Sequence, residues 1–373
     1  MELVVKKNDL LRELQLFQGI VERKNTIPIL ANVLMEARGN EIRMLATDLE
    51  VGLRSTCDAI VEKDGTLTLP AKKLYEIVKA LPDTDVRITE DKNGVRVAAD
   101  RFDSRMQTLP KEDFPAVPES SGSTSAMLPR AAVREMVAKT QFAITGEDTR
   151  YFLNGALFIL GATSMSLVAT DGHRLALVNV DRPKGSPRPS KDADDVRAIL
   201  PRKTLWELGK LLTEGEDDIR YERGENHLFF EVAGRMLISR MIDGQFPAFE
   251  RVIPKGNNKR IEFERERLTN AVKRVALLSN ERSRAVKFQI DKGKVEVTSS
   301  SPEFGEAKET LPVDYSDASM QICFNAQYVM DFLGAVDTDN VALELKDEVS
   351  QAVMKPIGTN GYDYTYVIMP MRV

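Results

Sequence analysis

The chain has 373 residues, of which 42% are hydrophobic, and its formal net charge is −5 at pH 7. A chain of this length exceeds the usual size of one hydrophobic core, so the composition predicts several domains. The acidic net charge argues against a uniformly basic nucleic-acid binder. Only an uneven distribution of charge, with basic residues gathered on one surface, could attract a polyanion.

The first residues, Met1 to Lys7, lack the apolar core and cleavage signature of a signal peptide. No apolar run approaches the roughly 18 residues that a helix needs to cross a bilayer. We therefore expect a cytoplasmic protein with no membrane partner. The two cysteines, Cys57 and Cys323, have no metal-ligand spacing. We expect buried reduced thiols rather than a disulfide, and neither a metal nor a cofactor.

The first third of the chain predicts two helices separated by strands. Apolar residues at spacings of three or four begin at Leu10 and follow Asn8, which is a suitable helix N-cap. Strand-like segments follow at 33–36 and 41–45. A second helix is predicted within residues 69–81.

The same order of elements recurs twice. The middle third predicts a helix over 133–142, strands at 156–160 and 166–169, and a helix within 200–212. The last third predicts a helix over 268–278, strands at 287–290 and 294–298 joined by a hairpin turn, and a helix within 324–336. Two helices and several hairpin-linked strands per unit predict an α+β fold, in which antiparallel sheets carry helices on one face.

Short echoes in the sequence support a threefold repeat. Ala46-Thr47-Asp48 returns as Ala169-Thr170-Asp171, and Phe114-Pro115-Ala116 returns as Phe246-Pro247-Ala248. An interval of roughly 125 residues indicates a repeated domain, because solenoid units are much shorter. We predict three domains, with polar joints at 117–125 and 253–259 and a polar loop at 181–195. Their predicted bounds are 1–122, 123–253 and 254–373.

The segment from Thr170 to Arg174 is the one that most resembles a site. Asp171 and His173 could form an acid/base pair, but no nucleophile or second carboxylate has a recognisable motif near them. The other interpretations are a tight turn between strands and a binding surface. His173 and His227 are the only histidines, so the sequence offers few candidates for a catalytic triad or a histidine-rich metal site.

Basic residues fall on or beside the predicted helices, while several carboxylates cluster in predicted loops. This arrangement would give the protein a bipolar surface that attracts a polyanion on one side. Charged residues on amphipathic helices are also ordinary solvated faces, and the pattern alone does not separate the two interpretations.

Four motifs carry a resemblance to a known family. Residues 151–155 are Tyr-Phe-Leu-Asn-Gly, residues 169–175 are Ala-Thr-Asp-Gly-His-Arg-Leu, residues 277–281 are Leu-Leu-Ser-Asn-Glu, and the chain ends in Tyr-Val-Ile-Met-Pro-Met-Arg-Val. Their order and spacing within a threefold repeat resemble the bacterial DNA polymerase III beta subunit, the sliding clamp, over the whole chain.

The resemblance implies a head-to-tail homodimer that forms a six-domain ring, with helices lining a central channel and sheets outside. Such a ring encircles double-stranded DNA without sequence specificity, slides along it and catalyses nothing. It tethers the DNA polymerase III alpha subunit, the clamp loader and other proteins that carry a clamp-binding motif. A multidomain DNA-binding protein that forms no ring is the alternative. By resemblance, the residues that face DNA are Lys24, Lys72, Lys73, Arg150, Tyr151, Arg202 and Lys203.

The family pattern also implies a partner-peptide pocket between the second and third domains. Carried over to this sequence, the pocket residues are Leu153, Thr170, Gly172, His173, Arg174, Leu175, Pro247, Arg251, Val252, Asn325, Tyr328, Val349, Val367, Met369, Pro370, Met371 and Arg372. Methionines can repack around different peptides, which suits a hub with several partners. Ser283 departs from the family, in which an aromatic can occupy this position, so we expect a more open rim there.

The alternating polar side chains of residues 101–108 predict an edge strand at the end of the first repeat. By resemblance, this strand meets the third domain of the other subunit. The implied dimer-interface residues are Arg101, Ser104, Met106, Leu277 and Leu278.

Overall fold

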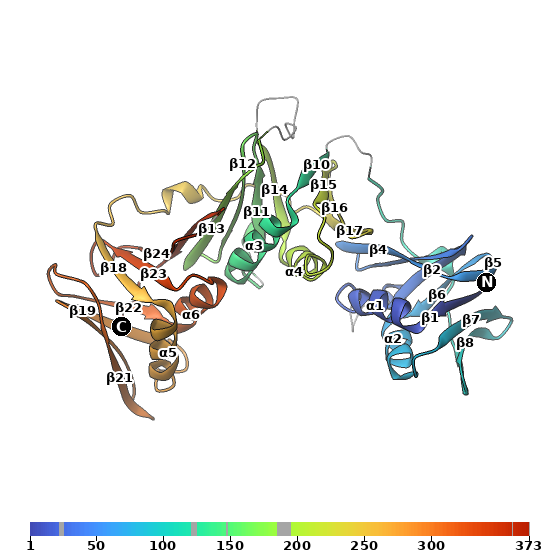
Figure 1. Cartoon of the computed structure of the whole chain (residues 1–373), viewed down its shortest axis with the longest axis horizontal. Coiled ribbons are helices and arrows are strands. Elements are labelled where there is room, and N and C mark those ends of the chain that lie inside the picture. Colours follow the sequence, from blue (N-terminus) through green and yellow to red (C-terminus); the bar gives the residue numbers. More distant parts are fainter. Residues whose placement is uncertain (22–25, 121–124, 147, 185–194, 360, 373) are drawn as a thin grey trace. The chain divides into compact units, whose positions relative to one another are not determined.

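The computed structural model of the chain describes residues 1–21, 26–120, 125–146, 148–184, 195–359 and 361–372. Most of the predicted loop at 181–195, part of the joint at 117–125, and Lys24 lie outside the described residues. The chain forms two compact units, Met1–Arg134 with Lys203–Met241, and Glu135–Arg202 with Ile242–Val373. Both units combine helices with antiparallel sheets, which confirms the predicted α+β class (Figure 1).

The helices form where the apolar periodicity predicts them, although the first helix of each repeat begins about one turn earlier than expected. The described residues form α1(Lys7–Phe17), α2(Ala71–Ala80), α3(Arg130–Thr140), α4(Arg202–Leu211), α5(Arg265–Ala276) and α6(Ala326–Ala335). In α1 the apolar stripe of Leu10, Leu14 and Phe17 is buried. No helix in the described part of the chain is long and apolar enough to span a membrane.

The predicted N-cap of α1 is wrong. The helix begins at Lys7, directly after a strand, and its N-cap residue is Lys6. The Asn8 amide lies inside the helix and donates a hydrogen bond to Asp83 Oδ1 at 2.9 Å. The Lys7 amide donates to the Thr84 carbonyl at 3.2 Å, so a tertiary contact takes the place of a side-chain cap.

The first unit contains two sheets. The five-stranded sheet has the order β5(Ile60–Lys63), β1(Glu2–Lys6), β7(Asp85–Asp91), β8(Gly94–Ala99) and β9(Phe102–Met106). The eight-stranded sheet has the order β10(Ser125–Leu128), β15(Ile219–Arg223), β16(His227–Val232), β17(Arg235–Arg240), β4(Val51–Asp58), β3(Glu41–Thr47), β2(Asn32–Arg38) and β6(Gly65–Pro70). Helices α1 and α2 pack against each other beside these sheets (Figure 1).

The second unit has a matching pair of sheets. The eight-stranded sheet has the order β14(Val196–Pro201), β11(Gly155–Leu160), β12(Ser164–Thr170), β13(Arg174–Asp181), β25(Asp363–Ile368), β24(Ala352–Ile357), β23(Asn340–Leu345) and β18(Lys259–Glu264). The four-stranded sheet has the order β21(Gly305–Pro312), β20(Lys294–Ser301), β19(Ala285–Asp291) and β22(Met320–Asn325). The six strand segments predicted between the helices each lie inside an observed strand, whereas the edge strand predicted at 101–108 is shorter and covers Phe102–Met106.

Both eight-stranded sheets run from one repeat into the next. In the first unit, β17 of the second repeat pairs antiparallel with β4 of the first, and Leu237 lies opposite Leu53. In the second unit, β13 pairs with β25 of the third repeat, and Leu175 lies opposite Val367. Neighbouring repeats are therefore joined by continuous backbone hydrogen bonding rather than by side-chain contacts alone.

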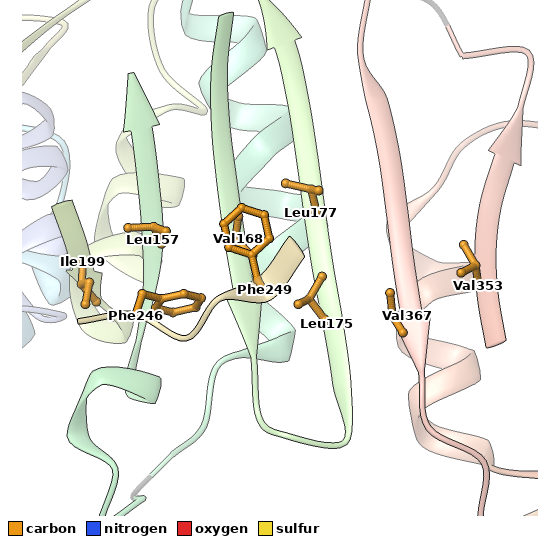
Figure 2. Packing of buried hydrophobic residues seen from close by; sticks show 9 residues of the cluster. All are labelled: Leu157, Val168, Leu175, Leu177, Ile199, Phe246, Phe249, Val353 and Val367. Carbon is orange, nitrogen blue, oxygen red and sulfur yellow. The ribbon is translucent and has the colours of Figure 1, made fainter. Parts of the chain in front are cut away.

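The core beneath the pairing of β13 with β25 is a cluster of buried apolar residues from six strands, β11, β12, β13, β14, β24 and β25, and from the segment after β17. Figure 2 shows Leu175 and Leu177 on one side of the joint and Val367 and Val353 on the other. Phe246 and Phe249 cover the cluster from the segment that carries the second Phe-Pro-Ala echo. Burying one side chain of this size contributes about 1.5–3 kcal/mol, so the cluster fixes both the joint and the segment above it.

Candidate functional site

An open cavity of about 170 Å³ lies over this buried cluster. Its floor is apolar and buried, with Leu153, Leu175 and Val367 each 2% exposed or less. Its rim includes two exposed apolar side chains, Val252 and Met369. The full lining consists of Arg150, Leu153, Thr170, Gly172, Arg174, Leu175, Pro247, Phe249, Val252, Val367 and Met369. A largely apolar hollow with a few polar groups at its edge suits a short peptide with apolar side chains.

The polar edge of the cavity is the turn between β12 and β13. Asp171 Oδ1 accepts hydrogen bonds from the amides of His173 at 2.9 Å and Arg174 at 3.0 Å. The Thr170 hydroxyl donates to the Arg174 carbonyl at 2.7 Å and accepts from the Gly172 amide at 3.1 Å. Asp171 therefore closes a turn, and this arrangement matches the turn interpretation of the sequence rather than an acid/base pair.

Arg174 ties the cavity wall to neighbouring elements. Its Nε donates to Asp171 Oδ2 at 3.0 Å, its Nη2 donates to the Phe142 carbonyl at 2.6 Å, and its Nη1 donates to Asp331 in α6. The guanidinium also lies 4.3 Å from the ring centroid of Tyr328. Burial opposes the charge, but the surrounding Tyr366, Asp331 and Asp171 raise the pKa of Arg174 above its ordinary value. Arg174 is therefore a fixed cation that holds β13 and α6 together.

Arg150 stands at the edge of the cavity beside Gly172. Its guanidinium forms a two-point ion pair with Asp148, with Nε to Oδ1 at 2.9 Å and Nη2 to Oδ2 at 2.8 Å. Hydrogen bonds from Arg150 lower the pKa of Asp148 to about 2. Gly172 has a φ of 88°, and an added Cβ would lie 3.5 Å from Arg150 Nη2. The distance to Arg150 is an ordinary van der Waals contact, so the left-handed φ of the turn is what favours glycine at this position.

The C-terminal tail closes the remaining side of the cavity. The Met369 amide donates to the His173 carbonyl at 2.9 Å, so the tail continues the pairing of β25 with β13 past the end of the strand. The Met371 amide donates to the Cys323 carbonyl at 2.8 Å. These two bonds hold the tail at both residues, and Met369 alone of the two methionines contributes to the lining.

The cavity brings together many of the predicted pocket residues, namely Leu153, Thr170, Gly172, Arg174, Leu175, Pro247, Val252, Val367 and Met369. The other predicted residues are described but do not line it: His173, Arg251, Asn325, Tyr328, Val349, Pro370, Met371 and Arg372. Of these, Tyr328 supports Arg174, and Asn325 accepts a hydrogen bond from the Gln327 amide as the N-cap of α6. Val349 is 66% exposed. The use of this cavity as a peptide site stays a prediction.

Ser283, where the family can have an aromatic, is described but does not line the cavity. Its amide donates to Asn280 Oδ1 at 3.1 Å in a turn after α5. The predicted opening of the rim at Ser283 therefore stays a prediction.

The residues predicted to face DNA fall into two groups. Lys72, Lys73, Arg150, Tyr151 and Arg202 are exposed. Lys73 Nζ lies 2.7 Å from Glu76 Oε2, a surface pair that costs little to break. Lys203 differs, because its ammonium donates to the Ile20 carbonyl at 2.8 Å and pairs with Asp48. Lys203 is thus engaged within its own unit, and the DNA-facing assignments stay predictions.

The residues predicted for the dimer interface lie in and beside strand β9 and at the end of α5. Strand β9, which contains Ser104 and Met106, is an edge strand of its sheet, and Arg101 is in the turn before it. Leu277 at the end of α5 is 76% exposed, and Leu278 follows it. The edge position of β9 confirms the predicted edge strand, and the dimer-interface residues stay predictions.

Models of three protein domains match the chain in order. They are the N-terminal, central and C-terminal domains of the DNA polymerase III beta subunit, matched over residues 1–118, 127–248 and 250–372. The chain belongs to the DNA polymerase III beta subunit family. The three clamp domains and the clamp fold are thereby confirmed, while the domain bounds proposed from the sequence differ from the matched ranges by a few residues and stay predictions.

Full-length relatives and solved structures agree with the family. The beta sliding clamp of Pseudomonas putida is 37% identical and that of Escherichia coli K12 is 34% identical, each covering 100% of both chains. A Pseudomonas aeruginosa sliding clamp bound to griselimycin has a TM-score of 0.92 at 36% identity over 100% of both chains. A Caulobacter crescentus beta subunit has a TM-score of 0.90 at 35% identity with the same coverage.

Sequence reasoning missed two features of this cavity. Phe249 lines it but was not among the predicted pocket residues, although it directly follows the Phe-Pro-Ala echo that begins at Phe246. Arg150 was assigned to DNA alone, and it lines the cavity as well. The apolar residue next to a repeated motif was the available signal for Phe249, whereas the position of Arg150 depends on a turn that periodicity does not resolve.

Proposed function

We propose that this member of the sliding-clamp family is a cytoplasmic processivity factor that closes into a homodimeric ring around double-stranded DNA. The ring slides without reading sequence, tethers the replicative polymerase and other partners through the cavity beside Leu175, and catalyses no reaction itself. The polymerase partner is the DNA polymerase III alpha subunit, and the clamp loader shares the same cavity.

The observation that carries the ring is a pair of unmatched sheet edges. Strands β4, β13 and β21 are each eight residues long. Each is the last strand of a set of four neighbouring strands that belongs to one repeat. Within the chain, β4 pairs with β17 and β13 pairs with β25. The remaining equivalents, β9 and β21, both lie at sheet edges. A second copy, arranged head to tail, would pair β9 with β21 and leave no such edge open.

The register of the β17 joint with β4 predicts which residues would meet. There the first residue of β4, Val51, lies opposite the fifth residue of β17, Ser239. The same register sets Gly305, the first residue of β21, opposite Met106, the fifth residue of β9. Arg105 then lies opposite Glu306, and Asp103 lies opposite Lys308.

These pairs favour the head-to-tail arrangement. Opposite charges directly across an antiparallel pair contribute about 0.2–1 kcal/mol each, and like charges destabilise it. The register also matches half-buried Ser104 with half-buried Ala307, so the side chains that face the interior stay on one side. The exposed Leu277 and Phe102 would gain cover in such an interface.

Topological closure explains how an acidic protein can hold DNA. Sequence-independent contacts to phosphates are weak, about 10⁻⁴ to 10⁻⁶ M, and fall with salt. A ring needs only diffuse contacts from exposed cations such as Lys72, Lys73 and Arg202, because escape requires opening rather than release.

A retention experiment tests the proposal. The protein is loaded by a clamp loader onto nicked circular plasmid, and free protein is removed by gel filtration. We expect co-elution with the circular DNA and loss once a restriction enzyme linearises it. Equal retention on circular and linear DNA would favour the alternative, a DNA-binding protein that forms no ring.

A further inference from the structure

The chain has one tryptophan, Trp206, and its side chain lies on the surface of α4. It is 53% exposed, whereas the neighbouring Leu205 and Leu208 are buried. An indole this exposed contributes little to the core, so its role depends on the side chains around it. On a helix, those are the residues three and four positions away.

Cations bracket the indole on its own helix. Arg202 lies four residues before Trp206 and Lys210 lies four residues after it, and both are exposed. The intervening acid, Glu207, is buried, and its carboxylate accepts from Lys210 Nζ at 2.8 and 3.0 Å. The exposed stripe Arg202, Trp206 and Lys210 therefore places an aromatic face between the guanidinium of Arg202 and the ammonium of Lys210, which is ion-paired with Glu207.

The corresponding helix of the first repeat shows what is particular to this stripe. Counted from the start of each helix, Tyr75 in α2 matches Trp206 in α4, and Lys79 matches Lys210. In α2 the ammonium of Lys79 lies 5.5 Å from the centroid of the Tyr75 ring, so tyrosine and lysine engage each other. In α4 the matching lysine is drawn to Glu207 instead, and the larger ring stands out from the helix.

We propose that the stripe Arg202, Trp206 and Lys210 binds single-stranded DNA by stacking an unpaired base on the indole of Trp206 while the two cations contact the flanking phosphates. Bases inside a duplex already stack on one another and offer no free face, so the stripe selects the unpaired strand. This inference rests on the proposed function, because a ring on duplex DNA would meet unpaired nucleotides where the duplex ends.

Because Trp206 is the only tryptophan, its intrinsic fluorescence reports on this contact alone. The full-length protein is titrated at low salt with a twenty-nucleotide oligothymidylate and, separately, with a duplex of the same length. We expect saturable quenching by the single strand and little quenching by the duplex. Equal quenching by both would mean that the indole contacts the backbone, and no quenching would mean no contact. Either result would overturn the proposal.

Variants separate this contact from the ring. A stacked base is worth about 1–3 kcal/mol, so Trp206→Leu should weaken binding of a labelled oligothymidylate about tenfold, and Trp206→Phe should keep most of the affinity. Tyr75→Leu, at the matching position of α2, is the control and should bind the oligonucleotide as the parent does. Trp206→Leu should still remain on circular plasmid, so failure of the stacking site leaves the ring proposal intact. Unchanged oligonucleotide affinity in Trp206→Leu would contradict the stacking site.

Discussion

Asp48 and Asp171 occupy the same position in two copies of one turn. Each Oδ1 accepts hydrogen bonds from the amides two and three residues later, and each Oδ2 pairs with a cation, Lys203 for Asp48 and Arg174 for Asp171. Each turn leads into the strand that joins its repeat to the next, β4 or β13. The repeated Ala-Thr-Asp motif thus marks the turn that precedes each strand joining neighbouring repeats.

The two turns differ at the residue that follows the aspartate, and this difference predicts opposite effects of substitution. Leu49 has a φ of 80° where the second copy has Gly172 with a φ of 88°. A left-handed conformation costs a side-chain-bearing residue about 1–2 kcal/mol. We expect Leu49→Gly to keep or slightly raise the stability and Gly172→Ala to lower it by about 1 kcal/mol, as measured by urea unfolding. A loss of stability in Leu49→Gly comparable to that in Gly172→Ala would contradict this account.

A buried ion pair joins the first and second repeats in the first unit. Arg235 in β17 donates to both carboxylate oxygens of Glu13 in α1 at 2.7 Å, and Glu13 is 2% exposed. Without Arg235, the buried Glu13 carboxylate keeps only the exposed Arg12 as a cationic partner, so Arg235→Met should cost about 3 kcal/mol. Glu13→Leu combined with Arg235→Met should recover most of that loss. A double variant as unstable as the sum of the singles would show that the pair does not act as a unit.

The same pair predicts the acid sensitivity of the fold. Burial opposes ionisation of Glu13, but hydrogen bonds and charge from Arg235 and Arg12 hold its pKa below the ordinary value of 4.5. A lowered pKa stabilises the fold fully above pH 4.5, and this contribution is lost as the pH falls through the lower folded-state value. We expect the melting temperature of the parent to fall more steeply below pH 4.5 than that of the double Leu/Met variant. Parallel curves would contradict the assignment.

Two methionines of the tail provide a matched test of the partner cavity. Met369 lines it and Met371 does not, although both are held by backbone hydrogen bonds. Burial of one large apolar side chain contributes about 1.5–3 kcal/mol, so Met369→Ala should weaken a micromolar partner peptide tenfold or more. Met371→Ala should bind nearly as the parent does in a fluorescence anisotropy titration with a labelled polymerase-derived peptide. Equal losses in both variants would mean that the tail acts as a whole rather than through Met369.

The helices and strands were predictable because their signals are local. The stripe of Leu10, Leu14 and Phe17 specifies α1 without reference to any other segment. The joining of repeats into continuous sheets was not predictable, because the pairing of Leu237 with Leu53 depends on strands nearly two hundred residues apart. The same limit applies to Asn8, because α1 begins one residue earlier, at Lys7, whose backbone amide donates to Thr84 in a distant segment.

The residues of the candidate site were likewise predictable only where their contacts are local in the sequence. The turn from Thr170 to Arg174 is visible in the sequence because its hydrogen bonds are local. The place of Phe249 in the lining depends on how its segment packs over the joint of β13 and β25, which no periodicity encodes. For residues carried over from the family, such as Val349, the sequence identifies the matching position but not whether the side chain lines the cavity.

The central claim is that two copies close a ring through β9 and β21, and a cross-link tests it most directly. The register predicts that Ser104 of one copy lies opposite Ala307 of the other, within the roughly 4.4–6.8 Å between Cα atoms that a disulfide spans. The double variant Ser104→Cys and Ala307→Cys, in a Cys323→Ser background, is loaded on nicked circular plasmid and oxidised. We predict a covalently closed dimer that stays on the circular DNA in denaturant and is released when the DNA is cut. Failure to form a dimeric cross-link, with the folded protein otherwise intact, would contradict the ring.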